Sequence, residues 1–130
     1  MNIPAELKFT KTDEWVKVEG NIATIGVSDF AQEQLSDVVF VEIVPGVGET
    51  VKAGGAAATL ESVKAAADVN LPVSGKVTAV NAALADKPET VNTDPYGAAW
   101  MLKIELSNPA EVAALMDAAA YEAFCKERGH

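Results

Sequence analysis

Short runs rich in β-branched residues occupy much of the chain, and many of them alternate with polar residues as β-strands do. Residues 15–27 hold two such runs around Glu19-Gly20-Asn21, which predicts a β-hairpin. Residues 38–44 form a further β-branched run that ends at Pro45-Gly46. Turn signals then separate shorter strands at residues 52–55, 64–65, 73–75 and 94–97. Turns at this spacing predict a mainly β fold with short helices, either a small barrel or a sandwich.

Two segments have the pattern of helices instead. Ser28 and Asp29 can cap a short helix over residues 30–35, with Gln32 as the reciprocal partner of Asp29. Near the end of the chain, Asn108 can act as a cap, Pro109 suits the first helical position and Glu111 suits the first turn. We therefore expect a C-terminal amphipathic helix, broken near Asp117. Its apolar face would consist of Val112, Leu115, Met116, Ala119 and Ala123.

One short motif occurs twice, since Glu49-Thr50-Val51 recurs as Glu89-Thr90-Val91 on the other side of Lys64. A chance triplet in a valine-rich chain explains this as well as a quasi-repeat does. A quasi-repeat would give two similar half-sheets that face each other.

Length and charge narrow the classes of function. The 130 residues suit one domain, residues 1–130, and the net charge of −9 would repel the phosphates of a nucleic acid. No apolar run approaches the roughly 20 residues that cross a bilayer, and the N-terminus lacks the order of a signal peptide. We expect a protein of a soluble, reducing compartment, which is the cytoplasm in a bacterium or the matrix for a mature mitochondrial chain.

The residues of metal and redox chemistry are scarce. Cys125 is the only cysteine and His130 the only histidine, so the sequence offers no ligand set for zinc or an iron–sulfur cluster. Cys125 is expected to be a packing residue of the C-terminal helix, and Trp15, Phe40 and Trp100 to pack in the core or against strands.

Lys64 is the candidate for chemistry. It lies between two predicted strands, where a tight turn would hold its backbone while the side chain projects into water. Ala65, Ala66 and Ala67 leave the approach to its amine uncrowded. From this position alone, an ordinary solvated charge at a turn is the more common explanation of Lys64.

The segment around Lys64 resembles the lipoylation segment of glycine cleavage H proteins, and the resemblance extends over nearly the whole chain. The motifs that carry it are Glu61-Ser62-Val63-Lys64-Ala65, Asp68-Val69, Pro72-Val73-Ser74-Gly75, Glu14-Trp15-Val16, Ala23-Thr24-Ile25-Gly26, Phe30-Ala31, Val38-Val39-Phe40-Val41-Glu42, Val91-Asn92, Asp94-Pro95-Tyr96-Gly97 and Trp100-Met101. The chain departs from the family at Asp13, where histidine is common, and at Ala66 and Ala67, where hydroxyl residues are common.

The resemblance implies a barrel-sandwich hybrid whose exposed hairpin presents Lys64, joined through an amide to lipoic acid. Such a protein is a carrier and not an enzyme. It would shuttle the aminomethyl group of glycine from a pyridoxal-phosphate decarboxylase (P protein) to a tetrahydrofolate-dependent aminomethyltransferase (T protein). Dihydrolipoamide dehydrogenase (L protein) would then reoxidise the arm. Enzymes that attach lipoate are further expected partners, and the free carrier is expected to be a monomer.

The same resemblance suggests roles for other residues. Glu61, Ser62, Val63, Ala65 and Gly75 would form the turn that presents Lys64. Glu14 and Asp68 are candidates to contact the cationic amine of the loaded arm, although each could equally be an ordinary surface carboxylate.

Four alternatives remain open at this point. A lipoyl domain of a 2-oxoacid dehydrogenase, or a lipoyl donor to such complexes, is close in chemistry, but those domains carry Asp-Lys-Ala at the turn. A biotinyl carrier usually has methionines beside its lysine, where this chain has Val63 and Ala65. An enzyme with Lys64 as a Schiff-base nucleophile would need a desolvated amine. A purely structural interaction module is the fourth.

Overall fold

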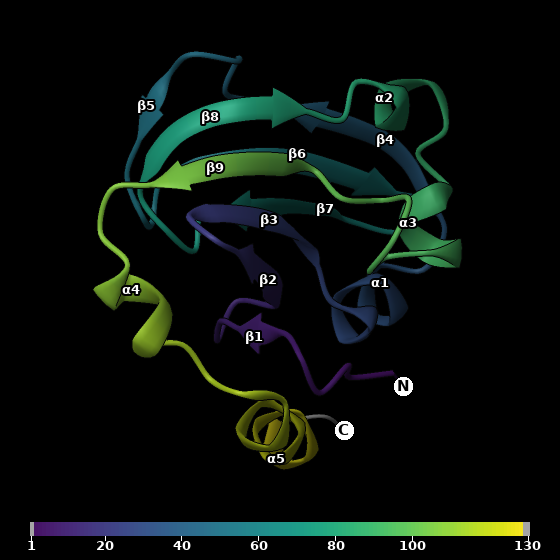
Figure 1. Ribbon diagram of the computed structural model, residues 1–130. Helices are drawn as coiled ribbons and strands as arrows, with labels where there is room; N and C mark the ends of the chain where they lie inside the picture. Colours follow the sequence, from purple (N-terminus) through teal and green to yellow (C-terminus); the bar gives the residue numbers. More distant parts are fainter. Residues whose placement is uncertain (1, 129–130) are drawn as a thin grey trace.

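A computed structural model describes residues 2–128 and shows two β-sheets packed against each other, with helices at the edges (Figure 1). His130 lies outside the described residues. The six-stranded sheet has the order β1-β2-β3-β9-β8-β5 and the three-stranded sheet the order β4-β6-β7. All pairings are antiparallel. The strands are β1 Lys8–Phe9, β2 Glu14–Glu19, β3 Ile22–Val27, β4 Val38–Ile43, β5 Thr50–Val51, β6 Ala56–Ser62, β7 Ala66–Asn70, β8 Gly75–Val80 and β9 Leu102–Leu106.

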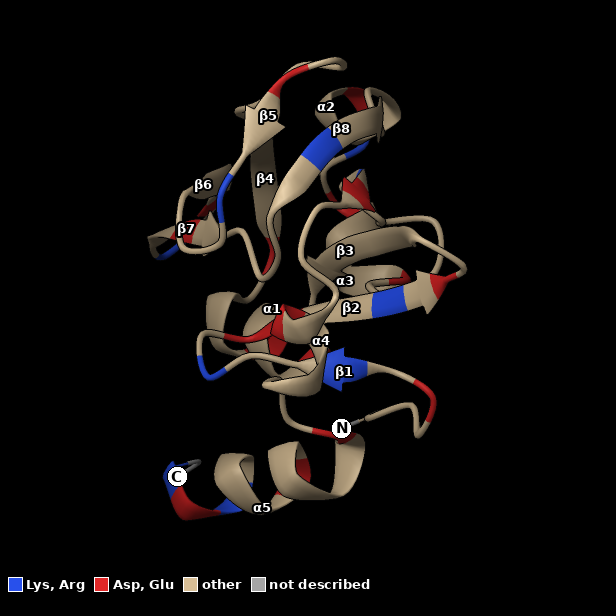
Figure 2. Ribbon diagram, turned by 60° about the vertical axis from the view of Figure 1, so that its left-hand side comes forward, with Lys and Arg blue, Asp and Glu red and all other residues tan. Residues whose placement is uncertain are grey.

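The helices are short except for the last. They are α1 Asp29–Leu35, α2 Ala83–Asp86, α3 Thr90–Thr93, α4 Ala110–Ala113 and α5 Ala118–Arg128. In Figures 1 and 2, α5 lies at the end of the molecule next to β1, while α2 lies near the ends of β4 and β8. The predicted fold class, mainly β with short helices and a C-terminal helix, is confirmed.

The predicted hairpin over residues 15–27 is formed by β2 and β3, which pair from Glu14 with Val27 to Glu19 with Ile22. Gly20 turns the chain with a φ of +64°, in the left-handed region that glycine adopts without strain. Gly26 has a packing role, because a Cβ there would lie 2.7 Å from the indole nitrogen of Trp15. The indole therefore lies flat over β3 and donates a hydrogen bond to the carbonyl of Pro95 at 3.0 Å.

The apolar side chains form two cores. The larger one fills the space between the sheets, with Ile25 and Ile104 from one sheet and Val41, Leu60 and Val69 from the other. The smaller one lies between β1 and α5 and includes Phe9, Trp15, Phe30, Tyr121 and Cys125. Each fully buried large side chain of this kind contributes roughly 1.5–3 kcal/mol to folding. Trp15 and Cys125 are buried as predicted, whereas Phe40 is 43% exposed on β4, which excludes the core and leaves packing on the strand.

Helix α1 begins as the sequence predicts. Ser28 is its N-cap and accepts a hydrogen bond from the backbone N–H of Ala31 at 3.2 Å. Asp29 is the first helical residue, and its carboxylate accepts a bond from the side-chain amide of Gln32 at 2.6 Å. The hydrogen bonds accepted by Ser28 and Asp29 thus stabilise the first turn of this helix.

The C-terminal segment is broken near Asp117, as predicted, but its caps and its buried face differ from the prediction. Met116 exchanges two backbone hydrogen bonds with Phe9, at 2.8 and 2.9 Å, and this pairing separates α4 from α5. The helical phase restarts after the break, so Ala119 and Ala123 are exposed and Tyr121 and Cys125 are buried. No side-chain hydrogen bond caps α4, so the role assigned to Asn108 is wrong.

Glu111 lies in the first turn of α4, as predicted, and it also makes contacts outside the helix. Its carboxylate accepts hydrogen bonds from the backbone N–H of Ser74 at 2.7 Å and from the Ser74 hydroxyl at 2.9 Å. It therefore ties α4 to the connection that leads into β8.

The quasi-repeat is also wrong. Thr50 and Val51 form strand β5 because they pair with Lys76 and Gly75 of β8. Thr90 and Val91 begin helix α3, where the N–H of Val91 donates to the carbonyl of Pro88 at 3.1 Å. The shared triplet thus adopts two conformations, set by what each copy can pair with.

Candidate functional site

The β6–β7 hairpin carries Lys64 at its tip, as the sequence predicts. Glu61 pairs with Ala66, and residues 62–65 make the turn. The hydroxyl of Ser62 accepts hydrogen bonds from the backbone N–H groups of Lys64 at 3.2 Å and Ala65 at 3.0 Å. The N–H of Ser62 donates to the carbonyl of Ala65 at 2.8 Å, which closes the turn. One small side chain thus fixes the backbone on both sides of the lysine.

The tip is also anchored to the body of the protein. The N–H of Val63 donates to the carbonyl of Asp37, in the connection between α1 and β4, at 3.0 Å. Val63 itself is 68% exposed, and Lys64 and Ala65 are exposed as well. The lysine is therefore held by a defined backbone while its amine is open to an approaching enzyme, an arrangement opposite to the desolvated pocket of a Schiff-base lysine.

Glu61 and Gly75, also assigned to the presentation turn, lie in different places. Glu61 is exposed on β6, opposite Phe40 of β4 and next to the tip. Gly75 begins β8 in the other sheet, so its place in the presentation turn is corrected. A Cβ at Gly75 would lie 2.0 Å from the carbonyl oxygen of Glu105. Gly75 is therefore needed where β8 and β9 approach closely, and it does not belong to the turn itself.

A cleft of about 180 Å³ opens between the start of β2, helix α1 and the β6–β7 hairpin. Its walls bring together both of the acids that the resemblance suggested, Glu14 and Asp68. The other lining residues are Thr12, Asp13, Val27, Ala31, Gln34, Leu35, Leu60, Ala67 and Val69. Asp68 is four residues beyond Lys64, which at about 3.3 Å per strand residue places the cleft roughly 13 Å from the lysine along the hairpin.

Glu14 is not an ordinary surface carboxylate, because only 1% of the residue is exposed. Its Oε1 atom accepts hydrogen bonds from the hydroxyls of Thr10 and Thr12, both at 2.5 Å. Its Oε2 atom accepts one from the backbone N–H of Asn70 at 3.1 Å. Burial raises the pKa of Glu14 above its ordinary value, and these three hydrogen bonds oppose the rise. The site therefore holds a carboxylate in a fixed position, and a nearby cation would favour the charged form of that carboxylate.

Asp68 differs from Glu14 in its setting. It is exposed on β7, where it pairs with Thr59 of β6. The cleft thus offers a cationic group one buried acid that is fixed by hydrogen bonds and one solvated acid at its wall. Thr10, Thr12 and Asn70 were not identified from the sequence. The spacing Thr10-x-Thr12-x-Glu14 was the available signal for the two hydroxyls, whereas Asn70 becomes a neighbour only through folding.

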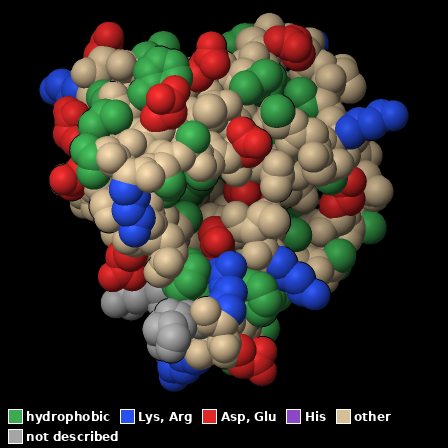
Figure 3. All heavy atoms as spheres, turned by 180° about the vertical axis from the view of Figure 1, so that it is seen from behind, with side chains coloured by type: hydrophobic (Ala, Val, Ile, Leu, Met, Phe, Trp, Pro, Cys, Tyr) green, Lys and Arg blue, Asp and Glu red, His purple; other side chains and the backbone are tan. Residues whose placement is uncertain are grey.

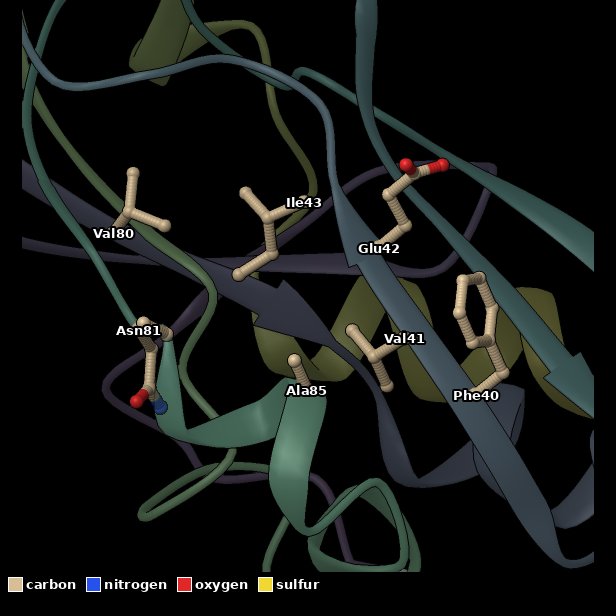
Figure 4. A pocket seen from close by; sticks show the side chains of 8 residues that line it. Phe40, Val41, Glu42, Ile43, Val80, Asn81 and Ala85 are labelled. Atoms are coloured by element: carbon tan, nitrogen blue, oxygen red, sulfur yellow. The ribbon is translucent and has the colours of Figure 1, made fainter.

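A larger cavity, of about 390 Å³, lies between β4 and the segment from Val80 to Ala85 (Figure 4). Val41 and Ile43 project from β4 toward Val80 and Ala85, while Phe40 and Glu42 project to the other side. The cavity walls are mostly apolar. It has no positioned acid comparable with Glu14, so the smaller cleft is the better match to a cationic ligand.

Acidic side chains other than Glu14 are visible on the back of the molecule (Figure 3). On the face seen in Figure 3, acidic side chains are scattered among apolar and basic ones. Glu14 differs from these exposed acids because it is buried and lines a cleft. Within residues 2–128, no helix combines the length and hydrophobicity needed to span a bilayer.

The fold and the tip together define a small β carrier module of the barrel-sandwich type, with a lysine presented on an exposed hairpin. Residues 7–128 match the family model described as Glycine cleavage H-protein. The chain belongs to this family, whose members are non-catalytic lipoyl carriers of the glycine cleavage system. The recognition of this family from the sequence is confirmed.

Individual relatives agree with the family model. The chain is 55% identical to the glycine cleavage system H protein of Symbiobacterium thermophilum, over 97% of this chain and 98% of that one. It is 53% identical to that of Cronobacter sakazakii, over 97% of this chain and 98% of that one. The crystal structure of the H protein from Mycobacterium marinum superposes with a TM-score of 0.84 at 34% identity, covering 98% of this chain and all of the other.

Proposed function

We propose that Lys64 carries lipoic acid in amide linkage and that residues 1–130 act as one carrier domain of the glycine cleavage system. The observation that carries this proposal is the tip itself, where Ser62 fixes the backbone and the lysine side chain stays exposed. Family membership supplies the cofactor, and the tip supplies one position suited to it. When bound, lipoic acid would supply a disulfide that can take up the aminomethyl group of glycine and later be reoxidised.

The chain itself would contribute position and not catalysis. The four-carbon stem of Lys64, lengthened by the cofactor, would swing between partner active sites and the cleft of Glu14 and Asp68. Amide formation removes the charge of the lysine, so the cargo amine would be the cation that the cleft receives. The buried carboxylate of Glu14 would attract that amine, and the apolar wall of Val27, Leu35 and Leu60 would accommodate the arm.

The partners follow from this role. The carrier would meet the decarboxylase, the aminomethyltransferase and dihydrolipoamide dehydrogenase in turn, and an enzyme that attaches lipoate before any of them. It would act as a monomer in the cytoplasm of a bacterium. Val63, exposed beside Lys64, is accessible to any of these partners.

Intact-mass spectrometry of the chain, produced with lipoate and a lipoate-attaching enzyme, tests the proposal. The expected result is one lipoyl adduct, mapped by peptide analysis to Lys64. The Lys64→Arg variant should gain none, whereas Lys76→Arg, which changes an exposed lysine on β8, should be loaded normally. An adduct on another lysine would overturn the assignment, and a biotinyl adduct would favour the biotin carrier.

A further inference from the structure

Asp13 stands between two residues of the cleft, Thr12 and Glu14, and has an unusual backbone. Its φ is +76°, in the left-handed region that glycine adopts freely and other residues adopt at a cost. The N–H of Asp13 donates to the carbonyl of Thr10 at 3.3 Å, so Asp13 ends the tight turn between β1 and β2. A glycine would satisfy this turn without strain. The aspartate side chain therefore needs an explanation beyond the turn.

That side chain joins the cleft to α5. Its Oδ1 atom accepts a hydrogen bond from the hydroxyl of Tyr121 at 2.7 Å. The guanidinium of Arg128 forms an ion pair with the same carboxylate and donates to its Oδ2 atom at 3.2 Å. Two residues of α5, about two helical turns apart, thus hold the residue that precedes Glu14.

Tyr121 also reaches the opposite wall of the cleft. Its hydroxyl lies 2.6 Å from the hydroxyl of Ser28, and both residues are buried. Ser28 is the N-cap of α1, the helix that supplies Ala31, Gln34 and Leu35 to the cleft. One phenol therefore contacts two of the three regions that form the cleft, the turn before β2 and the start of α1.

Helix α5 is itself fixed against the body of the protein. The ring of Tyr121 stacks on Phe9, with centroids 4.4 Å apart and planes 3° from parallel. The guanidinium of Arg128 lies over Phe30 at 4.2 Å and over Phe124 at 4.4 Å from the ring centroids. Because these aromatic contacts hold Tyr121 and Arg128 in place, the two side chains can hold Asp13 in a fixed position.

We propose that α5 is a positioning element for the arm cleft, in which Tyr121 and Arg128 hold Asp13 and thereby place the carboxylate of Glu14. This rests on the proposed function for the identity of the ligand, but the placement of Glu14 concerns the chain alone. Without the two contacts, the strained turn at Asp13 can relax. The hydrogen bonds of Glu14 to Thr10, Thr12 and Asn70 would then loosen together.

The first test uses the unmodified chain and the charge-neutral variant Tyr121→Phe. Two measurements report on Glu14, namely its pKa, from the carboxyl ¹³C shift, and hydrogen exchange at the amide of Asn70. Tyr121→Phe should loosen the hydrogen bonds that lower the pKa of Glu14, so this pKa rises further and the Asn70 amide exchanges several-fold faster. The matched control is Tyr96→Phe, whose hydroxyl contacts Asp29 and Asn2 but not Asp13. It should leave both measurements unchanged.

The second test covers the case in which Tyr121→Phe fails to fold. Arg128→Gln removes a partly exposed contact to Asp13, and Lys126→Gln removes the same charge from the same helix at a residue paired only with Glu122 at the surface. Only Arg128→Gln should speed exchange at Asn70, and Arg128→Lys should restore much of the protection. If Tyr121→Phe and Arg128→Gln lower the melting temperature but leave the Glu14 pKa and Asn70 exchange as in the parent, α5 merely covers the core and the proposal is wrong.

The loaded protein gives the functional readout. Tyr121→Phe should be lipoylated as efficiently as Tyr96→Phe, yet it should lose its aminomethyl cargo several-fold faster when no transferase is present. Equal rates of loss would overturn the link between α5 and cargo retention. A chain that takes no lipoate at Lys64 would refute the proposed function instead, while the two measurements on the unmodified chain would still decide the role of α5.

Discussion

The backbone N–H of Asn70 donates a hydrogen bond to the carboxylate of Glu14 at 3.1 Å, which joins the far end of the lysine-bearing hairpin to the first residue of β2. The strand that presents Lys64 at one end thus contacts, at the other end, the acid proposed to receive the arm. Because the contact is made by a main-chain group, it depends on the path of β7 and not on the side chain of Asn70. The hairpin that presents Lys64 therefore also forms one wall of the cleft and holds the acid inside it.

Lys64→Arg should abolish lipoylation and leave folding nearly intact. An exposed substitution away from caps, turns of special geometry and buried contacts changes the free energy of unfolding by less than about 0.5 kcal/mol. Intact mass measures the loading and urea denaturation the stability. A Lys64→Arg chain that still supports glycine cleavage would place the arm elsewhere.

Ser62→Ala should weaken presentation of the lysine. The substitution removes the acceptor for the N–H groups of Lys64 and Ala65, each such hydrogen bond contributing about 0.5–1.5 kcal/mol. The turn should become mobile, and the rate of lipoylation should fall although Lys64 is unchanged. Amide exchange at residues 64 and 65 checks the first part and a loading time course the second. Ser62→Thr, which keeps the hydroxyl, is the control that should load close to normally.

Glu14→Gln should alter the pH dependence of stability. Burial raises the pKa of Glu14 in the folded state, so ionising it costs folding free energy. This cost is absent below the ordinary pKa and grows as the pH rises through the raised value. The parent should therefore lose stability relative to Glu14→Gln over the pH range that begins at the ordinary pKa of 4.5. Urea unfolding of both proteins across this range measures the difference, and parallel profiles would contradict it.

Glu14→Gln should also release the cargo faster without affecting lipoylation or reoxidation of the arm, since neither step involves a cationic amine. The cargo should be lost several-fold faster, because Glu14 is buried and an ion pair with it contributes at least the roughly 1 kcal/mol at the upper end for exposed pairs. The measurement is the decay of the isolated loaded protein beside the parent at equal pH and salt. If the two decay alike, Asp68 becomes the acid to test.

Gly75→Val should destabilise the fold through β8 and β9, because its Cβ would lie 2.0 Å from the carbonyl oxygen of Glu105. Relieving such an overlap costs at least the 1–3 kcal/mol typical of overpacking, so a clear fall in melting temperature is expected. Lipoylation should fall in proportion to the folded fraction. Gly20→Ala is a comparison with a left-handed glycine in open space, and it should cost less.

Prediction from the sequence succeeds for those parts of the structure that depend on residues close together in the chain. The β2–β3 hairpin, the Ser28 cap and the exposed tip at Lys64 each depend on a few adjacent residues, and each is found where the sequence places it. The C-terminal helix shows the limit. Its break could be expected from local sequence, but its buried face could not, because Met116 pairs with Phe9 and so resets the helical phase.

The environment of Glu14 is beyond local prediction for the same reason. The resemblance identified Glu14 and Asp68 as candidates, but it could not tell that Glu14 is buried and Asp68 exposed. The setting of Glu14 depends on contacts distant in sequence, such as the hydrogen bond from Asn70, 56 residues away. The contact between Asp13 and Arg128 is harder still to predict, because the two residues are 115 positions apart in the sequence. No periodicity or spacing in the chain links those two positions.

The connectivity of the two sheets has a consequence for the newly made chain. The three-stranded sheet is drawn from residues 38–70, each strand pairing with a near neighbour in sequence, whereas β9 inserts between β3 and β8 and completes the other sheet last. Short loops close quickly and distant pairings slowly. During synthesis the lysine-bearing hairpin can therefore form while the residues of β9 and α5 are still untranslated. Lipoate can then be attached to Lys64 early. The cleft that shelters the cargo is complete only once the last residues have emerged.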